Sequence, residues 1–269
     1  MRLALFISVL LAVARLAAAQ QAATVHPTVS SVVDRMKSAT WTERSKAFED
    51  ATELIRSGEE NPQDADRLRL GVIQLLVTEN NDQTPPASER EGEENGEYYA
   101  SLVGFVASLG DERAIPSLLG AATTGGIAIR GVVQFGKKAL DPTLEQVKSP
   151  DPKLASGAVF VIRELLKMGA ASDPDSQLRI KNALRSALAS PEFAVRLSAI
   201  AAVEYLDDRE ELVPMLKDIA EHDPVKLAGQ KPDDGGDNGE FYPVRQDARR
   251  LLRKIANHEP PLIDKGVSH

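Results

Sequence analysis

The sequence predicts an all-α protein, a right-handed α-solenoid of about five or six helical hairpins. Apolar residues recur along the chain at the spacing of one face of an α-helix. Segments that share a pattern return at a period of roughly 40 residues, as they do in stacked helical repeats. No comparable stretch alternates apolar and polar residues for long enough to form a strand.

Helical spacing is clearest in the segment KLASGAVFVIRELL. Leu154, Ala158, Ile162 and Leu165 lie at offsets of 0, 4, 8 and 11 residues, which places them on one face of a helix. Three other segments show the same offsets, the last of them with a looser pattern around it: Val195, Ala199, Val203 and Leu206; Val244, Ala248, Leu252 and Ile255; and Tyr98, Leu102, Val106 and Leu109.

The helical segments also repeat. SPDPKLASGAV begins at Ser149, and SPEFAVRLSAI begins 41 residues later at Ser190. The pair Val195-Arg196 returns as Val244-Arg245, 49 residues later, and the acidic stretch GQKPDDGGDNGE accounts for the added length. A period in this range indicates stacked supersecondary units.

These segments resemble the second helices of HEAT-like repeats, an armadillo-type α-solenoid family, which open on VR or LA after a turn with Asp or Pro. DERAIPSLLGAA, DPTLEQVKSP and REELVPMLKDIA resemble the first helices, with Pro116 and Pro214 inside them. The resemblance covers about residues 95–257 and, more weakly, 29–79. It implies an architecture and no particular activity. Gly131 and Gly136 weaken the helix of the copy IAIRGVVQFGKKAL, so we expect a distorted unit there.

The expected organisation follows from these patterns. Residues 1–19 form a signal peptide, 20–28 a flexible segment, 29–257 the solenoid with acidic loops near 80–96 and 223–241, and 258–269 a tail. We expect helices at these positions: 29–38, a second from Thr40, 63–79, 98–109, 112–123, 127–139, 141–148, 153–168, 175–189, 192–206, 209–221 and 242–257.

The first residues predict export. Arg2 supplies a positive charge, an apolar stretch follows from Leu3 to Ala14, and small residues at 17–19 favour cleavage near Ala19–Gln20. The alternative is a membrane anchor, but a spanning helix needs about 20 apolar residues. Arg15 interrupts this run. We therefore expect a periplasmic or extracellular protein with no membrane span after signal cleavage.

Composition excludes several classes of site. The chain has no cysteine, which rules out disulfides, thiolate nucleophiles and cysteine-based metal sites. Its formal charge is −8, or −10 without Arg2 and Arg15, and no run of Lys and Arg is longer than the pair at 249–250. Nucleic-acid binders usually carry a basic stripe, so no nucleic-acid partner is expected.

No catalytic pattern is present in the sequence. The four histidines form no HExxH spacing, and no GxSxG motif exists. We therefore expect a protein that is not an enzyme and has no cofactor. A lyase-like enzyme stays open as an alternative, because short HEAT-like repeats also resemble the phycobilin lyase family.

Two acidic loops end in the same five-residue pattern, Asn-Gly-Glu-aromatic-Tyr. Asn-Gly favours a turn, and a glutamate after it suits a helix entrance. The aromatic residues have two explanations: they fasten the loop to a neighbouring repeat, or they bind a partner. The candidate partner-binding residues are Asn95, Glu97, Tyr98, Tyr99, Asn238, Glu240, Phe241 and Tyr242.

The second acidic loop also offers Asp233, Asp234 and Asp237 as hard oxygen ligands, a weak alternative that predicts calcium. Their spacing does not fit the EF-hand loop, and a calcium- or glycan-binding module is kept as a second possibility. The main prediction is an exported, non-catalytic scaffold that binds another protein. Glu97 and Glu240 would select basic or hydrogen-bond-donating partners.

Overall fold

The computed structural model describes residues 28–58, 60–227 and 241–259. These ranges are α-helical, with turns and one isolated antiparallel bridge between Leu227 and Phe241. None of their helices is both long and apolar enough to cross a lipid bilayer. The expected signal peptide and most of the expected tail lie outside the described residues.

Contacts divide the chain into two compact units, residues 1–68 and 69–269, with the boundary inside helix α4 (Pro62–Asn81). The first unit contains α2 (Val29–Arg35), which packs against α3 (Trp41–Ser57). Its buried core includes Val32, Met36 and Phe48.

The second unit contains the end of α4 and nine further α-helices among the residues that the structure describes. They are α5 (Glu89–Ser108), α6 (Ile115–Ala121), α7 (Gly126–Val133), α8 (Leu140–Gln146), α9 (Pro152–Lys167), α10 (Pro174–Leu188), α11 (Phe193–Val203), α12 (Val213–His222) and α13 (Pro243–Ala256). Three short 3-10 helices precede α6, α8 and α12: η1 (Glu112–Ala114), η2 (Gly136–Ala139) and η3 (Arg209–Leu212).

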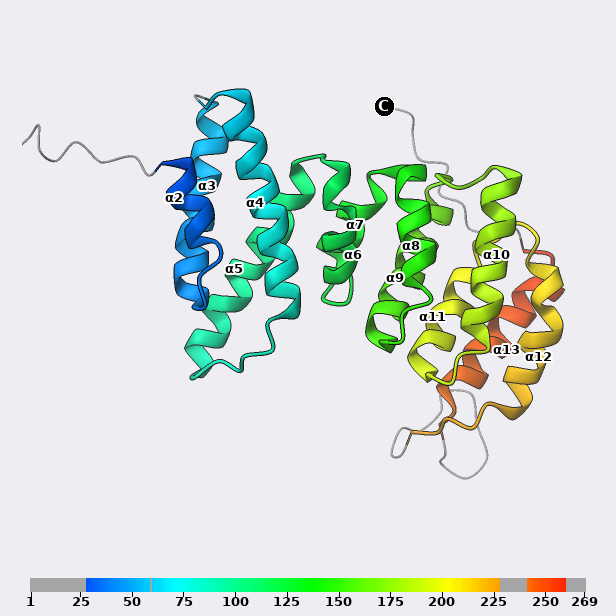
Figure 1. Ribbon diagram of the computed structural model, residues 1–269. Helices are drawn as coiled ribbons and strands as arrows, with labels where there is room; N and C mark the ends of the chain where they lie inside the picture. The colour runs from blue at the N-terminus through cyan, green and yellow to red at the C-terminus, as the bar shows by residue number, and fades with distance from the viewer. Residues whose placement is uncertain (1–27, 59, 228–240, 260–269) are drawn as a thin grey trace, which may run out of the picture. The chain divides into compact units, whose positions relative to one another are not determined.

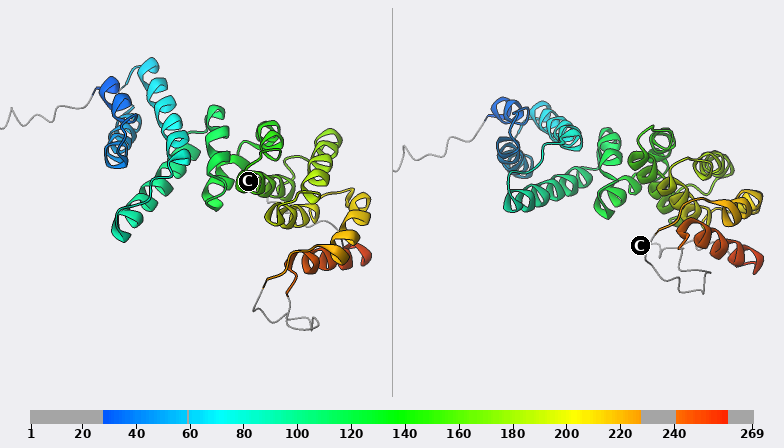
Figure 2. Two further views of the ribbon diagram at one scale, coloured as in Figure 1. Left: turned by 60° about the horizontal axis from the view of Figure 1, so that its bottom comes forward. Right: turned by 90° about the horizontal axis from the view of Figure 1, so that it is seen from below.

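These helices form two layers (Figure 1). In the layer that we call the B layer, α5 packs against α7, α7 against α9, α9 against α11, and α11 against α13. The A layer contains α6, α8, α10 and α12, and each of these forms a hairpin with the B-layer helix that follows it. Figure 2 shows the same succession from two other sides. The four stacked hairpins of the second unit confirm the predicted all-α solenoid.

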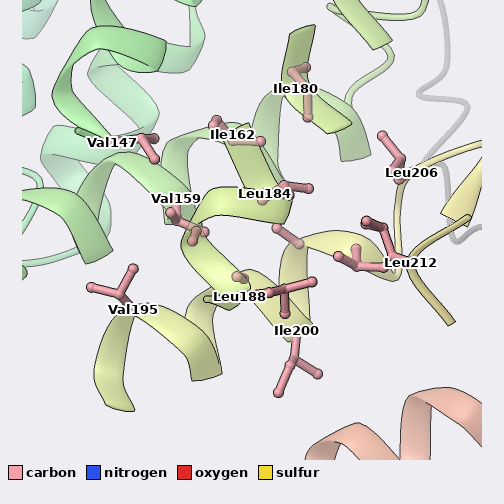
Figure 3. Close-up of a cluster of buried hydrophobic side chains, with 14 of the residues drawn as sticks. Val147, Val159, Ile162, Ile180, Leu184, Leu188, Val195, Ile200, Leu206 and Leu212 are labelled. Atoms are coloured by element: carbon pink, nitrogen blue, oxygen red, sulfur yellow. The ribbon is translucent and has the colours of Figure 1, made fainter. Parts of the chain in front are cut away.

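A continuous apolar core lies between the layers (Figure 3). Val159 and Ile162 of α9 meet Ile180 and Leu184 of α10, and all four side chains are fully buried. Burying one such side chain stabilises the fold by about 1.5–3 kcal/mol, so the inward positions of the repeat hold the hairpins together. Of the predicted inward face of α9, Ala158, Ile162 and Leu165 are fully buried, whereas Leu154 in the first turn is half-buried.

The A-layer helices begin differently from the prediction. Pro116 and Pro214 lie in the first turn of α6 and α12, and a 3-10 turn precedes each of them. The first turn tolerates proline because its missing N–H has no partner there in any helix. The expected helices near 112–123 and 209–221 are therefore each a 3-10 turn followed by an α-helix.

The expected distortion after residue 127 is confirmed. Helix α7 ends at Val133, and Gly136 has a φ of +57°, which an L side chain rarely adopts. Gly131 has a packing role, since a Cβ there would lie 2.7 Å from Cβ of Ala107 on α5. The two glycines that weaken the helix thus allow close packing of α7 on α5 and a sharp exit toward α8.

The repeated Val-Arg pair has a structural cause at Arg196. Its guanidinium donates to the carbonyl oxygens of Ser190 and Pro191 at 2.7 and 2.8 Å. Its Nε donates to the Asp223 carboxylate at 2.7 Å, and both side chains are almost completely buried. Arg44 in the first unit repeats part of this arrangement, because it donates to two carbonyls of the turn before α3.

Candidate functional site

Helix α5 begins at Glu89, about nine residues before the predicted start near 98. Ser88 caps it by accepting the backbone N–H of Glu91 at 3.2 Å, and the Glu91 carboxylate accepts the N–H of Ala87 at 2.6 Å. Arg90 and Glu94 form an i,i+4 ion pair at 2.8 Å along the same helix. The prediction of a loop over 80–96 is therefore too long, since residues 82–88 alone connect α4 to α5.

The first copy of the repeated pattern consequently lies inside a helix. Asn95 and Gly96 are helical, so the prediction of a turn at this dipeptide is wrong. Glu97 is exposed on the helix and does not mark its entrance. The entrance lies at Ser88, whose hydroxyl supplies the cap well before the Asn-Gly pair.

The two tyrosines of this copy attach α5 to the end of α4. The Tyr98 hydroxyl donates to the Glu79 carboxylate at 2.9 Å, and the Tyr99 hydroxyl donates to Oδ1 of Asn80 at 2.7 Å. Tyr98 is buried and offers no surface to a partner, so its prediction as a partner-binding residue is wrong. Tyr99 is half-buried, and one side of it borders a groove.

This groove, which we call the Tyr99 groove, has a volume of about 600 Å³. Four segments of the second unit line it: the end of α4 with the following loop, the first half of α5, the turn between α6 and α7, and the start of α9. Asn80, at the base of this arrangement, is fixed by two bonds. Its Oδ1 accepts from Tyr99, and its Nδ2 donates to the carbonyl of Ser117 at 2.8 Å.

Two glycines on α5 shape the wall of the groove. Gly92 and Gly96 are four residues apart and lie on one helix face with Tyr99. A Cβ at Gly92 would lie 3.3 Å from Cγ of Pro86, so Gly92 admits this proline against the helix. A Cβ at Gly96 would meet nothing within 4 Å. Gly96 therefore leaves helix backbone exposed to the groove, and no neighbouring atom requires a glycine at this position.

Asn95 is the polar group that the fold leaves unused in the Tyr99 groove. Its side chain is half-buried and lines the groove, yet it makes no hydrogen bond to any residue in the described ranges. A side-chain amide has two N–H donors and one carbonyl acceptor. It can therefore pair with both the carbonyl and the N–H of a peptide unit.

The electrostatics of the groove are acidic. Glu79, Asp82 and Asp151 line it together with one cation, Lys153. Burial of Tyr99 raises the pKa of its hydroxyl above the ordinary value; a hydrogen bond with Thr124 opposes the shift, and the negative charge of Glu79 adds to it. Tyr99 accordingly stays protonated and continues to donate at neutral pH.

The second copy of the pattern lies at the start of α13. The backbone N–H of Leu227 donates to the carbonyl of Phe241 at 2.8 Å, and Tyr242 is the residue before α13, with Pro243 in the first turn. The Arg245 guanidinium lies 4.2 Å from the centre of the Tyr242 ring. Helix α13 thus begins one residue after the predicted start at 242. Asn238 and Glu240 lie outside the described residues.

The structure does not bring the two copies together. In the B layer α7, α9 and α11 lie between α5 and α13. Of the eight candidate residues, Asn95 and Tyr99 line one groove, and Phe241 and Tyr242 lie at the far end of the layer. The calcium candidates Asp233, Asp234 and Asp237 lie outside the described residues. The residues that the structure describes contain no group of three or more His, Asp or Glu placed to hold a metal ion.

Sequence reasoning missed the residues that other segments contribute to the groove, Asn80, Thr123, Thr124, Asp151 and Lys153. One signal could have pointed to the site. Gly92 and Gly96 have helical spacing, and two glycines in one helix face are unfavourable unless the backbone there must stay accessible.

No family model matches this sequence, and no curated protein matches it. Among solved structures, the chain is similar to a computationally designed armadillo repeat protein for modular peptide recognition, with 15% sequence identity and a TM-score of 0.38, over 84% of this chain and 99% of that one. It is also similar to an engineered protein, with 12% identity and a TM-score of 0.35, over 85% of this chain and 96% of that one. The helical-repeat architecture described above rests on the packing of this chain's own helices.

Proposed function

We propose that this protein is a non-catalytic scaffold that binds an extended segment of another protein in the Tyr99 groove. One observation carries the proposal: the Asn95 amide lies without an internal partner among the described residues, beside the bare backbone at Gly96. An amide with no partner in the fold is left to bond water in the groove, and a bound peptide unit would replace that water with direct hydrogen bonds. The rigid attachment of Tyr99 to Asn80 keeps the groove formed before binding.

The charge of the groove selects the partner. Glu79, Asp82 and Asp151 outnumber Lys153, and exposed Glu93 and Glu94 continue the acidic surface along α5. A segment that carries Lys or Arg would be attracted to this end of the second unit, because complementary charge speeds association and disfavours acidic competitors. We therefore attribute the expected preference for basic partners to the carboxylates of the groove and no longer to Glu97.

The test is selection from a displayed library of short random peptides against the full chain. Affinities of a selected peptide are then measured by calorimetry for the parent and for Asn95→Ala, Gly96→Ala and Gly104→Ala. Gly104 is the matched control, because it lies in the same helix, a Cβ there would meet nothing within 4 Å, and it does not line the groove.

We expect Asn95→Ala and Gly96→Ala to weaken binding about tenfold, or 1.4 kcal/mol, and Gly104→Ala to leave it unchanged. A library that yields only peptides indifferent to Asn95 and Gly96 would place the binding surface elsewhere. Peptides without Lys or Arg would contradict the charge argument while leaving the groove in place.

Export is a separate part of the proposal, supported by the N-terminal pattern of Arg2, the apolar run and the small residues at 17–19. Expression of the full chain in a bacterial host, followed by fractionation and intact-mass measurement, tests it. We expect a product that has lost residues 1–19 and leaves the cytoplasm. An uncleaved product that stays in the cytoplasm would overturn this part alone.

A further inference from the structure

The Tyr99 groove has a neighbour on the other side of the turn between α8 and α9. This second groove has a volume of about 740 Å³. It is lined by the end of α8, one face of α10, the turns that follow these two helices, and the starts of α9 and α11, all within the second unit. We call it the proline groove and define it by Val147, Pro150, Pro152, Ala183, Ala187 and Pro191.

The turn between α8 and α9 forms a wall of both grooves. Asp151 and Lys153 line the Tyr99 groove, whereas Pro150 and Pro152, which alternate with them in the sequence, line the proline groove. Consecutive Cα atoms are about 3.8 Å apart, so a single stretch of backbone separates the two grooves. Because an extended segment advances about 3.3–3.6 Å per residue, about two or three of its residues would cross this turn.

Both grooves lie along one edge of the second unit, where each A-layer helix turns into the B-layer helix that follows it (Figure 1). The α6–α7 turn borders the Tyr99 groove, and the α10–α11 turn borders the proline groove. Successive units are close at this edge. A Cβ at Gly157 on α9 would lie 3.3 Å from the backbone nitrogen of Thr123, and the hydroxyls of Ser156 on α9 and Ser198 on α11 lie 2.8 Å apart. The two grooves therefore follow one another along the edge.

The proline groove is apolar, whereas the Tyr99 groove is acidic. Val147, Ala155 and Ala187 are buried at its base, and Pro150 and Pro191 are exposed at its rim. Such a lining removes a large apolar side chain from water, which is the main source of free energy in a concave site of this kind.

The charged residues of the proline groove do not favour a basic side chain. Two cations, Lys148 and Arg179, line it with one acid, Glu192. Lys148 pairs with Glu145 at 2.8 Å, and Arg179 pairs with Asp141 at 2.5 Å. The Lys or Arg of a bound segment therefore belongs in the Tyr99 groove, and an apolar side chain belongs in the proline groove.

Hydrogen bonds hold both turns of the proline groove in place. The Ser149 hydroxyl accepts the backbone N–H of Asp151 at 3.2 Å, and the Ser190 hydroxyl accepts that of Glu192 at 3.2 Å. The Arg196 guanidinium also donates to the carbonyl of Ser190 at 2.7 Å. The groove is thus formed before a partner binds, which lowers the cost of ordering it.

We propose that one extended segment of the partner protein occupies both grooves, with Lys or Arg in the Tyr99 groove and, a few residues away, a large apolar side chain such as Leu, Met or Phe in the proline groove. The inference rests on the proposed function, since it continues the segment bound in the Tyr99 groove across the α8–α9 turn. The continuity of the two grooves and their different chemistry identify the occupant. Two unlike side chains at a fixed spacing then specify the partner.

The experiment compares a peptide selected on the full chain with a version of it in which the apolar residue is alanine. Calorimetry gives the Kd of both peptides for the parent, Ala183→Asp and Ser186→Trp. Ala183→Asp places a carboxylate in the proline groove, and Ser186→Trp fills the groove from an exposed position. Ala201→Asp is the matched control, because Ala201 is a half-buried alanine of α11 that lines neither groove. Circular dichroism checks that each variant keeps its helices.

We expect Ala183→Asp and Ser186→Trp each to raise the Kd of the selected peptide at least about tenfold and that of the alanine version less than about twofold. Ala201→Asp should change either Kd by less than about twofold. Equal losses for the two peptides, equal losses for Ala183→Asp and Ala201→Asp, or selected peptides without an apolar residue near Lys or Arg would overturn the proposal.

Asn95→Ala, measured in parallel, separates this inference from the proposed function. If Asn95→Ala weakens the selected peptide but Ala183→Asp and Ser186→Trp do not, the Tyr99 groove keeps its function and only the extension into the proline groove is wrong. If Asn95→Ala has no effect, the proposed function fails and the two-groove segment fails with it.

Discussion

Helices α5 and α13 occupy opposite ends of the B layer, and each is associated with one copy of Asn-Gly-Glu-aromatic-Tyr. In α5 the copy lies in the middle of the helix, whereas the second copy ends where α13 begins. Helix α5 is attached to α4 through tyrosine hydroxyls, but the attachment of α13 uses charged groups: Arg245 donates to the carbonyl of Asp223 at 2.5 Å, and Asp223 itself pairs with Arg196. The five-residue pattern therefore does not by itself determine whether it lies inside a helix or before one. That depends on where the preceding cap starts the helix and on which residues its side chains contact.

The largest expected effect tests the charged attachment. Arg196→Ala leaves the buried Asp223 carboxylate without its guanidinium, and we expect the free energy of unfolding to fall by about 3–5 kcal/mol. Urea unfolding followed by circular dichroism measures the change. The double variant Arg196→Met with Asp223→Leu is the control, since removal of both charges should recover much of the loss. A loss below about 1 kcal/mol for Arg196→Ala would show that the pair is dispensable.

A smaller loss is expected at the tyrosine attachment. Tyr98→Phe removes a hydrogen bond to a buried carboxylate and should lower the free energy of unfolding by about 1–3 kcal/mol. Tyr99→Phe removes a bond to the half-buried Asn80, and about 0.5–1.5 kcal/mol is expected. The same urea titration compares the two. If Tyr99→Phe lowers the free energy of unfolding more than Tyr98→Phe does, the more buried hydrogen bond is not the more stabilising one.

The third effect is a gain in stability. Glycine in a helix interior is about 0.5–1 kcal/mol less favourable than alanine, so Gly96→Ala and Gly104→Ala should each raise the midpoint of thermal unfolding. Gly92→Ala should gain less, because its Cβ would press against Pro86. Calorimetric melting of the three variants checks this order. A Gly96→Ala variant that melts lower than the parent would reveal a packing role for Gly96 that its surroundings do not show.

The smallest effect is the pH dependence of stability that the Asp173 carboxylate produces. Asp173 caps α10 and accepts hydrogen bonds from Ser176 and from Lys137, which hold its pKa well below the ordinary value. A carboxyl with a lowered pKa stabilises the fold above its unfolded pKa, about 3.9, and that stability is lost as the pH falls further. The melting temperature of the parent should exceed that of Asp173→Asn at pH 6, and the gap should narrow below pH 4. A gap that is constant with pH would mean that the charge of Asp173 is irrelevant.

The sequence predicted the architecture well because helical periodicity is a property of many residues at once. Ala158, Ile162 and Leu165 of α9 are fully buried as their offsets require, and the weakened copy at Gly131 and Gly136 is a shortened helix. The prediction failed where one short-range signal competed with another. Asn-Gly indicated a turn, but Ser88 had already started the helix.

The candidate site was predictable only in part. Asn95 and Tyr99 were found because the repeated pattern singled them out. The loop before α5, the α6–α7 turn and the start of α9 meet only after the hairpins have stacked, so no local pattern could join Thr124 or Asp151 to Asn95.

The buried pair of Arg196 and Asp223 couples two neighbouring hairpins. Arg196 belongs to α11 and Asp223 to the end of α12. If the last hairpin detached from the stack, the Arg196 guanidinium would therefore lose the Asp223 carboxylate that neutralises it. In a one-dimensional stack, such a penalty opposes fraying from the C-terminal end and enlarges the cooperative unit of unfolding. Amide hydrogen exchange should therefore report α11, α12 and α13 as one opening event.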